Sequence, residues 1–159
     1  MITKKKKSQL QEKKVADEIN ADVVVASGAL WGSKGDVRSD ELLIECKTTD
    51  NSYYVFHFAT WDKIRKEAIK DGLRIPVMSI DILGGKRRFA VFNSKDFEEH
   101  KGFKDMYFGT YALYVYKGSF RLTDPCIFYK ISVPYDRESV TDTYCVVPWE
   151  DFVRMYNEK

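Results

Sequence analysis

A short, almost continuous apolar run, LLIECK at residues 42–47, constrains the fold of this chain more than any other segment. Its length and composition predict a buried β-strand. Successive strand residues point to opposite faces of a sheet, so Glu45 and Lys47 share one face while Leu42, Ile44 and Cys46 point to the other. Charged side chains are seldom placed in such a strand without a partner or a task. The segment therefore predicts both a sheet core and a functional position.

The other segments predict an α/β protein with a mixed central sheet flanked by helices. The expected helices cover residues 8–20, 60–71 with Thr60 as N-cap and Gly72 as stop, and 149–157. The expected strands cover 23–27, 36–38, 53–57, 75–82 and 87–92, with further strand-like segments in YALYVY, CIFYKISV and YCVV. There is no internal repeat and no Pro- or Ser-rich linker, which indicates one domain. We divide the chain into a basic arm (1–7) and a single domain (8–159) that has a core (8–98) and an aromatic-rich C-terminal extension (99–159).

Composition excludes several classes of protein. The 159 residues are 44% apolar, which is enough for a real core, and no apolar run approaches the roughly 18 to 20 residues of a membrane helix. The N-terminus has lysines without a following apolar stretch, so we expect no secretory signal, no membrane association and a cytoplasmic location. The three cysteines show no CxxC spacing, which indicates neither a zinc site nor a disulfide framework. His57 and His100 have no clear ligand partner.

Basic charge is concentrated at the start of the chain. Residues 1–14 hold six lysines and one acid, although the net charge is only +2. Such an arm binds phosphates by releasing their condensed counterions, or it is simply a solvated end. The candidate phosphate contacts are Lys4, Lys5, Lys6 and Lys7. A smaller basic cluster, 86–88, follows the expected turn at Gly84 and Gly85.

Two carboxylates are expected to converge in the central hairpin. Asp36 lies nine residues before Glu45, and a turn at residues 39–40 would bring their strands together. Convergent carboxylates are costly unless a cation lies between them, and oxygen ligands select Mg²⁺, for which Mn²⁺ substitutes. Such an ion would polarise a phosphate and activate water, while Lys47 would orient that water or stabilise the developing charge. The alternative is a simple Glu45–Lys47 ion pair on a half-exposed strand.

The first helix supplies a third carboxylate. With about 100° per residue, Glu12 falls at about 200° from Leu10, inside an apolar stripe centred at about 190°. Glu18 falls at about 80°, towards the flank of that stripe. A carboxylate in an apolar face needs a partner, and joining Asp36 and Glu45 around a cation would supply one. The alternative is an exposed helix start beside Lys13 and Lys14.

The order of these features resembles that of the PD-(D/E)XK nuclease superfamily. A helix with an inward Glu, a strand, a Gly/Ser loop, an Asp and then E-x-K on a buried strand follow one another over about residues 8–82. Within the superfamily the chain is most similar to Holliday-junction resolvases of the archaeal and phage type, through SQLQEKKVADEI, VVVASG, GD and LLIECKTT. Gly35 replaces the proline of the name motif, and the interval from Asp36 to Glu45 is short.

The resemblance implies a restriction-endonuclease-like core and a catalytic set of Glu12, Asp36, Glu45 and Lys47, of which the three carboxylates would bind metal. It also implies that Ser27 or Ser33 lies near the scissile phosphate, and Lys34, beside Ser33, is a further candidate DNA contact. It implies a homodimer that cuts branched DNA. Residues 100–159 match no family that we can name.

Three functions follow from this pattern. The first is a magnesium-dependent DNA endonuclease that selects branched structures. The second is a restriction- or homing-type nuclease that recognises sequence, with the C-terminal third as the recognition element. The third is a non-catalytic DNA-binding protein that keeps the fold, against which the intact Asp36, Glu45 and Lys47 argue. Cleavage of junctions and plain duplexes, with and without magnesium, separates them.

Overall fold

The computed structural model describes residues 2–24, 35–98, 101–104, 109–110, 118–122, 129–135 and 140–158. In these residues the helices are α1 (Lys4–Ile19), α2 (Phe58–Lys70), α3 (Lys101–Lys104) and α4 (Trp149–Asn157), with short 3₁₀ helices at Leu83–Gly85 and Ser94–Phe97. The strands are β1 (Asp22–Val23), β2 (Val37–Arg38), β3 (Leu42–Thr48), β4 (Tyr54–His57), β5 (Ile75–Ile82), β6 (Arg87–Asn93), β7 (Gly109–Thr110), β8 (Ser119–Leu122), β9 (Tyr129–Tyr135) and β10 (Val140–Pro148).

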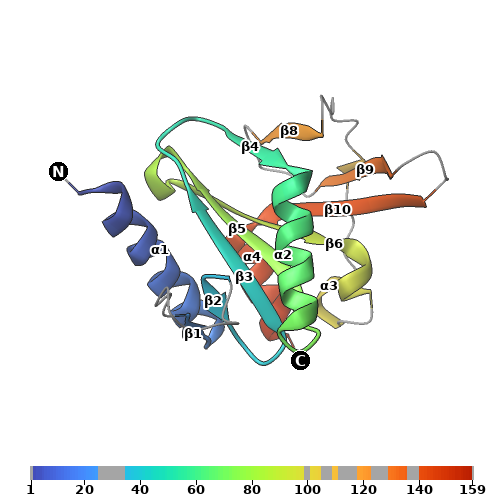
Figure 1. The fold of residues 1–159 in the computed structure, drawn as a ribbon, viewed down its shortest axis with the longest axis horizontal. Coiled ribbons are helices and arrows are strands. Elements are labelled where there is room, and N and C mark those ends of the chain that lie inside the picture. Colours follow the sequence, from blue (N-terminus) through green and yellow to red (C-terminus); the bar gives the residue numbers. More distant parts are fainter. Residues whose placement is uncertain are drawn as a thin grey trace.

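The described strands form one large mixed sheet and one small one. The large sheet has the order β1-β2-β3-β5-β6-β10-β9-β7, and β4 pairs with β8 in the second sheet (Figure 1). In the large sheet β3 runs parallel to β5 and β7 to β9, and the other neighbours are antiparallel. Helix α2 makes the crossover that a parallel pair requires between β3 and β5. The expected α/β fold with a mixed sheet flanked by helices is confirmed.

Alternation along the strands produces a core on each face of the sheet. Leu42, Ile44 and Cys46 of β3 pack with Val15 of α1 and Phe152 of α4 on one face. On the other face, residues of β5 and β6 pack against α2 and the β4–β8 ribbon; this second core includes Phe56, Trp61, Ile64, Met78, Ile80, Val91 and Phe120. Strand β3 therefore has helices on both sides, which explains its nearly continuous apolar sequence.

The described C-terminal residues extend the same sheet. Strand β10 pairs with β6 over Tyr144–Pro148, and α4 returns across the face that carries α1. Aromatic side chains of this region serve the core, since Trp149 and Phe152 are fully buried and their rings stack at 5.3 Å. No helix in the described part of the chain is long and apolar enough to cross a membrane.

Several expected boundaries were wrong. Helix α1 begins at Lys4 rather than residue 8, because the Thr3 hydroxyl accepts the N–H of Lys6 as an N-cap and lysine is a good helix former. The predicted basic arm (1–7) is thus mostly the first turn of a helix. Helix α2 begins at Phe58, because β4 runs directly into it, so Thr60 is not its N-cap.

Other expected elements lie partly or wholly outside the described residues. The strand expected over 23–27 is described only as Asp22–Val23, and the loop at 28–34 is not described. YALYVY and the first part of CIFYKISV also lie outside. The predictions of strands over 75–82 and 87–92, of a helix over 149–157 and of a stop at Gly72, where φ is +87°, are confirmed.

Candidate active site

The β2–β3 hairpin places Asp36 opposite Glu45. Val37 pairs with Ile44, so the next position along the hairpin brings Asp36 to Glu45. The backbone N–H of Asp36 donates to the Ile44 carbonyl at 2.9 Å, and the N–H of Cys46 donates to Asp36 Oδ2 at 2.7 Å. One oxygen of the Asp36 carboxylate is thereby fixed against the β3 backbone.

Asp36 and Glu45 repel one another in this arrangement. Burial and the charge of Glu45 raise the pKa of the Asp36 carboxyl, and the Cys46 N–H and Lys47 only partly oppose them. A cation between the two carboxylates would remove this repulsion. The chemistry of the donor set therefore fits a divalent ion.

Glu45 and Lys47 project side by side from β3, on the face opposite the α1–α4 core. Lys47 Nζ lies 2.5 Å from Glu45 Oε1, and the two side chains are 35% and 19% exposed. Burial by itself lowers the pKa of Lys47, but the hydrogen bond to Glu45 and its charge outweigh burial, so the pKa is raised. The ammonium group therefore keeps its proton at neutral pH.

Glu12 of α1 lies within electrostatic reach of the same group of charges. Burial raises the pKa of its carboxyl first, followed by the charges of Asp36 and Glu45, and Lys47 lowers it. The side chain is half-buried, as is that of Glu18, and the buried polar residue of α1 is the neighbouring Gln11 rather than Glu12. We define the acidic cluster as Glu12, Asp36, Glu45 and Lys47.

Sequence analysis missed three neighbours of the acidic cluster. Gln11 is buried, and its Nε2 donates to the carbonyl oxygens of Lys47 at 3.0 Å and Ser79 at 3.2 Å, which ties α1 to β3 and β5. Glu67 of α2 has a side chain that is only 10% exposed, and its charge raises the pKa of Asp36. Its spacing of three residues from Ile64, on the buried stripe of α2, was the available indication.

Tyr54, in β4, is the third missed neighbour. Its side chain is partly buried, and burial raises the pKa of its phenol, which Glu45 raises further and Lys47 lowers. Nothing in the local sequence indicates this proximity, because β4 pairs with β8 rather than with β3.

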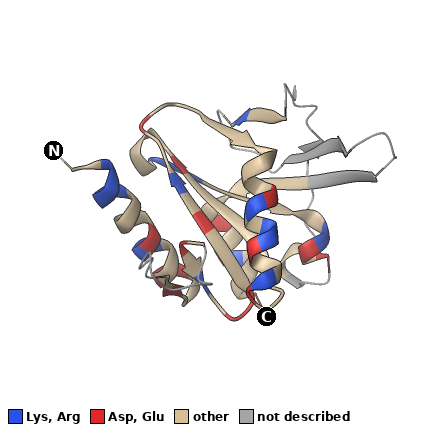
Figure 2. Cartoon of the chain, viewed as in Figure 1, with Lys and Arg blue, Asp and Glu red and all other residues tan. Residues whose placement is uncertain are grey.

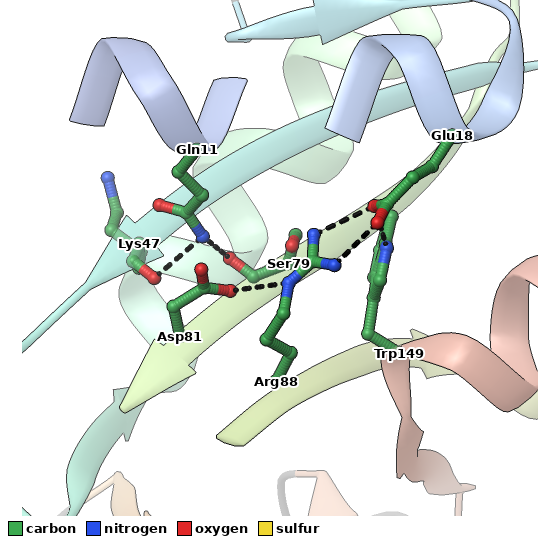
Figure 3. A network of polar contacts seen from close by, with 7 residues as sticks. All are labelled: Gln11, Glu18, Lys47, Ser79, Asp81, Arg88 and Trp149. Atoms are coloured by element: carbon green, nitrogen blue, oxygen red, sulfur yellow. Dashed lines mark hydrogen bonds and ion pairs between the residues drawn. The ribbon is translucent and has the colours of Figure 1, made fainter. Parts of the chain in front are cut away.

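Glu18, near the C-terminal end of α1, belongs to a different group (Figure 3). Its carboxylate accepts two hydrogen bonds from Arg88, at 2.7 and 2.8 Å, and one from Trp149 Nε1 at 2.7 Å. Arg88 also contacts Asp81 at 3.4 Å and lies over the Trp149 ring at 5.5 Å. We call these four residues the Arg88 network.

In the Arg88 network Arg88 compensates the charge of Glu18, whereas burial outweighs its effect on Asp81 and raises the pKa of that carboxyl. Burial alone raises the pKa of Glu18, but the hydrogen bonds from Arg88 and Trp149 outweigh burial, so the pKa is lowered. The side chain of Arg88 is only 8% exposed, because its guanidinium pairs with Glu18 and Asp81. Arg88 is therefore not part of the exposed basic cluster at 86–88 that the sequence indicates.

The remaining predicted contacts are spread over the molecule. Ser27, Ser33 and Lys34 lie outside the described residues, as does His100. Lys4, Lys5 and Lys6 are exposed on α1, whereas Lys7 is half-buried and pairs with Asp50. His57 is exposed at the end of β4. Figure 2 shows basic residues at the start of α1 and both signs of charge within β3.

The Cys46 thiol, between Glu45 and Lys47, is no nucleophile. It packs in the core, and burial, followed by the charges of Asp36 and Glu12, raises its pKa well above the usual value. A thiol that holds its proton so firmly is unreactive.

The described residues contain no ready-made cage of three or more His, Cys, Asp or Glu side chains for a metal ion. Glu12, Asp36 and Glu45, the three carboxylates expected to bind metal, are therefore not gathered into such a cage. Mg²⁺ is often bound by one or two carboxylates together with water and substrate phosphates, so two carboxylates fit this ion better than they fit a structural zinc.

Comparison with protein-family models, with curated proteins and with solved structures finds no match for this chain.

Proposed function

We propose that this protein is a metal-dependent DNA endonuclease of the PD-(D/E)XK type, which hydrolyses phosphodiester bonds. One observation carries the proposal: the Asp36 carboxylate is held by the Cys46 N–H across the hairpin from Glu45, whose neighbour on the same face is Lys47. Glu12 on α1 experiences the charges of all three residues. This is the combination of residues that the resemblance implies for phosphate-ester hydrolysis.

Asp36 and Glu45 would hold Mg²⁺, which supplies Lewis acidity towards a phosphate when it is bound. Asp36 is suited to this task, because the Cys46 N–H fixes one of its oxygens and thereby its orientation. Burial first, and then the charge of Glu45, raises the pKa of Asp36 in the metal-free protein.

Lys47 would stabilise the negative charge that develops on the phosphate. Its raised pKa keeps the amine protonated, so it serves as a cation and proton donor rather than as a general base. Glu12, whose pKa is raised, is suited to accept a proton at the same site. The Gln11 side chain keeps α1 fixed to the carbonyl of Lys47 and so maintains the relative position of these residues.

The order of elements supports the same family. Helix α1, strands β1 to β4, helix α2 and strand β5 succeed one another, and β3 with its E-x-K lies inside the sheet between β2 and β5. Selectivity for branched DNA and a homodimeric assembly are part of the proposal through the resemblance alone.

A second candidate is a non-catalytic DNA-binding protein with this fold. The 2.5 Å ion pair between Lys47 and Glu45 favours it, because each side chain already has a partner without metal or substrate. Against it stand Asp36 and Glu12, which Lys47 alone does not neutralise.

Incubation with labelled DNA tests the proposal. A four-way junction, a flap, a single strand and a plain duplex are each incubated with the protein, with and without Mg²⁺. We expect Mg²⁺-dependent cutting that is strongest on the junction. Cutting of one duplex sequence would indicate a restriction- or homing-type nuclease, and binding without cutting would support the second candidate.

A further inference from the structure

A groove lies beside the acidic cluster, between the start of α1 and the segment that follows β3. Its volume is about 460 Å³, and it is lined by Lys4, Lys7, Ser8, Thr48, Thr49, Asp50 and Asn51. Two ammonium groups, three hydroxyls and one amide therefore face a single carboxylate. We call it the α1–β3 groove.

The groove and the acidic cluster are neighbours along α1. Lys4, Ser8 and Glu12 are spaced by four residues, so successive members lie about 6 Å apart along the helix axis and about 40° apart around it. On β3, Thr48 directly follows Lys47. Because the Gln11 side chain bonds the Lys47 carbonyl, the helix and the strand are joined between the groove and the cluster.

The floor of the groove is rigid. The Thr49 N–H donates to the Asp81 carbonyl at 2.9 Å, and the carbonyls of Asn51 and Thr49 accept from Leu83 and Gly84, both at 3.0 Å. These bonds fix the 49–51 segment to the β5–β6 turn without using its side-chain hydroxyls as donors. The groove is therefore formed before any ligand arrives.

The single carboxylate in the groove is already neutralised. Lys7 Nζ lies 2.7 and 2.8 Å from the two oxygens of Asp50. Lys4 has no ion-pair partner among the residues that the structure describes. The lining thus retains one positive charge, with hydroxyls around it.

These groups match a phosphate rather than a base. Lysine, serine, threonine and asparagine side chains typically contact phosphate oxygens in protein–DNA complexes. The lining has no arginine fork of the kind that reads guanine. We infer that the α1–β3 groove binds an internal phosphate of the cut DNA strand, one or two nucleotides from the scissile bond, and so places the scissile phosphate at Lys47. This inference rests on the proposed function.

The first test measures binding with the substrate uncut. Fluorescence anisotropy follows a labelled junction in Ca²⁺ at several salt concentrations, for wild type and for Lys4→Gln/Ser8→Ala. We expect about tenfold weaker binding and a salt slope smaller by about 1. Lys70→Gln, which removes an exposed charge at the end of α2, should bind like wild type. Equal losses in both variants, or no loss in the double variant, would overturn the groove.

The second test identifies the phosphate. A neutral methylphosphonate is placed at each position around the cut, with and without a 5′-terminal phosphate on the strand. At one position within two nucleotides of the cut, the substitution should weaken wild type but not Lys4→Gln/Ser8→Ala. Dependence on the 5′-terminal phosphate, or equal effects in both proteins, would overturn the assignment to an internal phosphate.

Cleavage in Mg²⁺ is read separately. If the protein binds DNA through the groove but never cuts it, the proposed endonuclease activity is overturned and the groove remains a DNA contact. If the protein cuts normally when Lys4 and Ser8 are replaced, the proposed endonuclease activity stands and the proposed role of the groove is overturned. Circular dichroism verifies folding, and Lys4→Gln alone replaces the double variant if Ser8→Ala impairs it, since Lys4 is exposed.

Discussion

The middle and the C-terminal end of α1 carry charged groups of similar size and different character. At the C-terminal end Glu18 accepts hydrogen bonds from Arg88 and Trp149, which compensate its charge. In the middle of the helix Glu12 interacts electrostatically with Asp36 and Glu45, and Lys47 is the one cation among them. The pKa of Glu18 is lowered, whereas the pKa values of Glu12 and Asp36 are raised.

This difference separates a structural group from a candidate catalytic one. A folded protein gains stability from ionised Glu18, but it loses stability by ionising Asp36 beside Glu45. Unfavourable ionisation persists where a ligand or substrate relieves it, which is why perturbed groups gather at functional sites. The Arg88 network is expected to hold the fold together, and the acidic cluster to work on a substrate.

The largest expected effect is on cleavage. Asp36→Asn and Glu45→Gln each remove a metal ligand charge with little change of shape, so single-turnover cleavage of a junction should fall at least about a hundredfold. Lys47→Ala should lose cutting but keep DNA binding, because its ammonium acts mainly on the transition state.

Glu18→Gln is the matched control for these variants. It also removes one carboxylate charge from a half-buried position, and below its unfolding temperature it should cut within about threefold of wild type. Near wild-type cutting by Asp36→Asn would remove the basis for the comparison.

The next largest effect is on stability, where we expect Glu18→Gln rather than Asp36→Asn to be the damaging variant. Glu18→Gln should lower the free energy of unfolding by about 2 kcal/mol, because Arg88 is left inside the protein with a weaker partner. Asp36→Asn should not destabilise the metal-free protein. Urea denaturation in EDTA measures the free energy of unfolding of both variants. Equal destabilisation would show that the Arg88 network and the acidic cluster contribute to stability in the same way.

A smaller effect distinguishes the two helix carboxylates. Glu12→Gln should lower cleavage about tenfold, through the loss of one hydrogen-bonding charge near the substrate, while its stability changes little. The same single-turnover assay applies. If Glu18→Gln proved the more damaging to cleavage, our placement of the first-helix carboxylate would be wrong.

The β3 hairpin could be predicted because its evidence is local. Alternation fixes which face Glu45 and Lys47 occupy, and the interval from Asp36 fixes its approach across a tight turn. The 3.6-residue period was less decisive for Glu12, which is half-buried like Glu18 while Gln11 takes the buried polar position. These relations involve nearby residues and standard geometry.

The Arg88 network and the neighbours of the acidic cluster could not be predicted in this way. Arg88 finds Glu18 across 70 residues of sequence, and the contact of Gln11 with Ser79 spans 68. A basic cluster beside a turn is usually exposed, and here burial by distant partners overrides that tendency. The helical state of Lys4–Lys7 was missed because we interpreted charge as disorder, although Thr3 supplies an N-cap.

The smallest expected effect concerns pH. The pKa of Asp36 is raised above 3.8, so its ionisation disfavours the folded state, and stability rises as pH falls through the raised value. Asp36→Asn should therefore melt a few degrees higher than wild type at neutral pH in EDTA, with the difference vanishing in acid. Thermal melts from about pH 4 to pH 8 measure it, and a constant difference would exclude this cause.

The most direct test of the acidic cluster is a metal titration. Calorimetry with Ca²⁺, which we expect to support binding without cutting, is carried out on wild type with and without DNA, and on Asp36→Asn, Glu45→Gln and Glu18→Gln. Wild type and Glu18→Gln should bind the ion weakly alone and more tightly with DNA, whose phosphate adds a ligand. The other two variants should bind at least about tenfold more weakly. Wild type that binds no divalent ion in the presence of DNA, or Asp36→Asn that binds it equally well, would contradict the account.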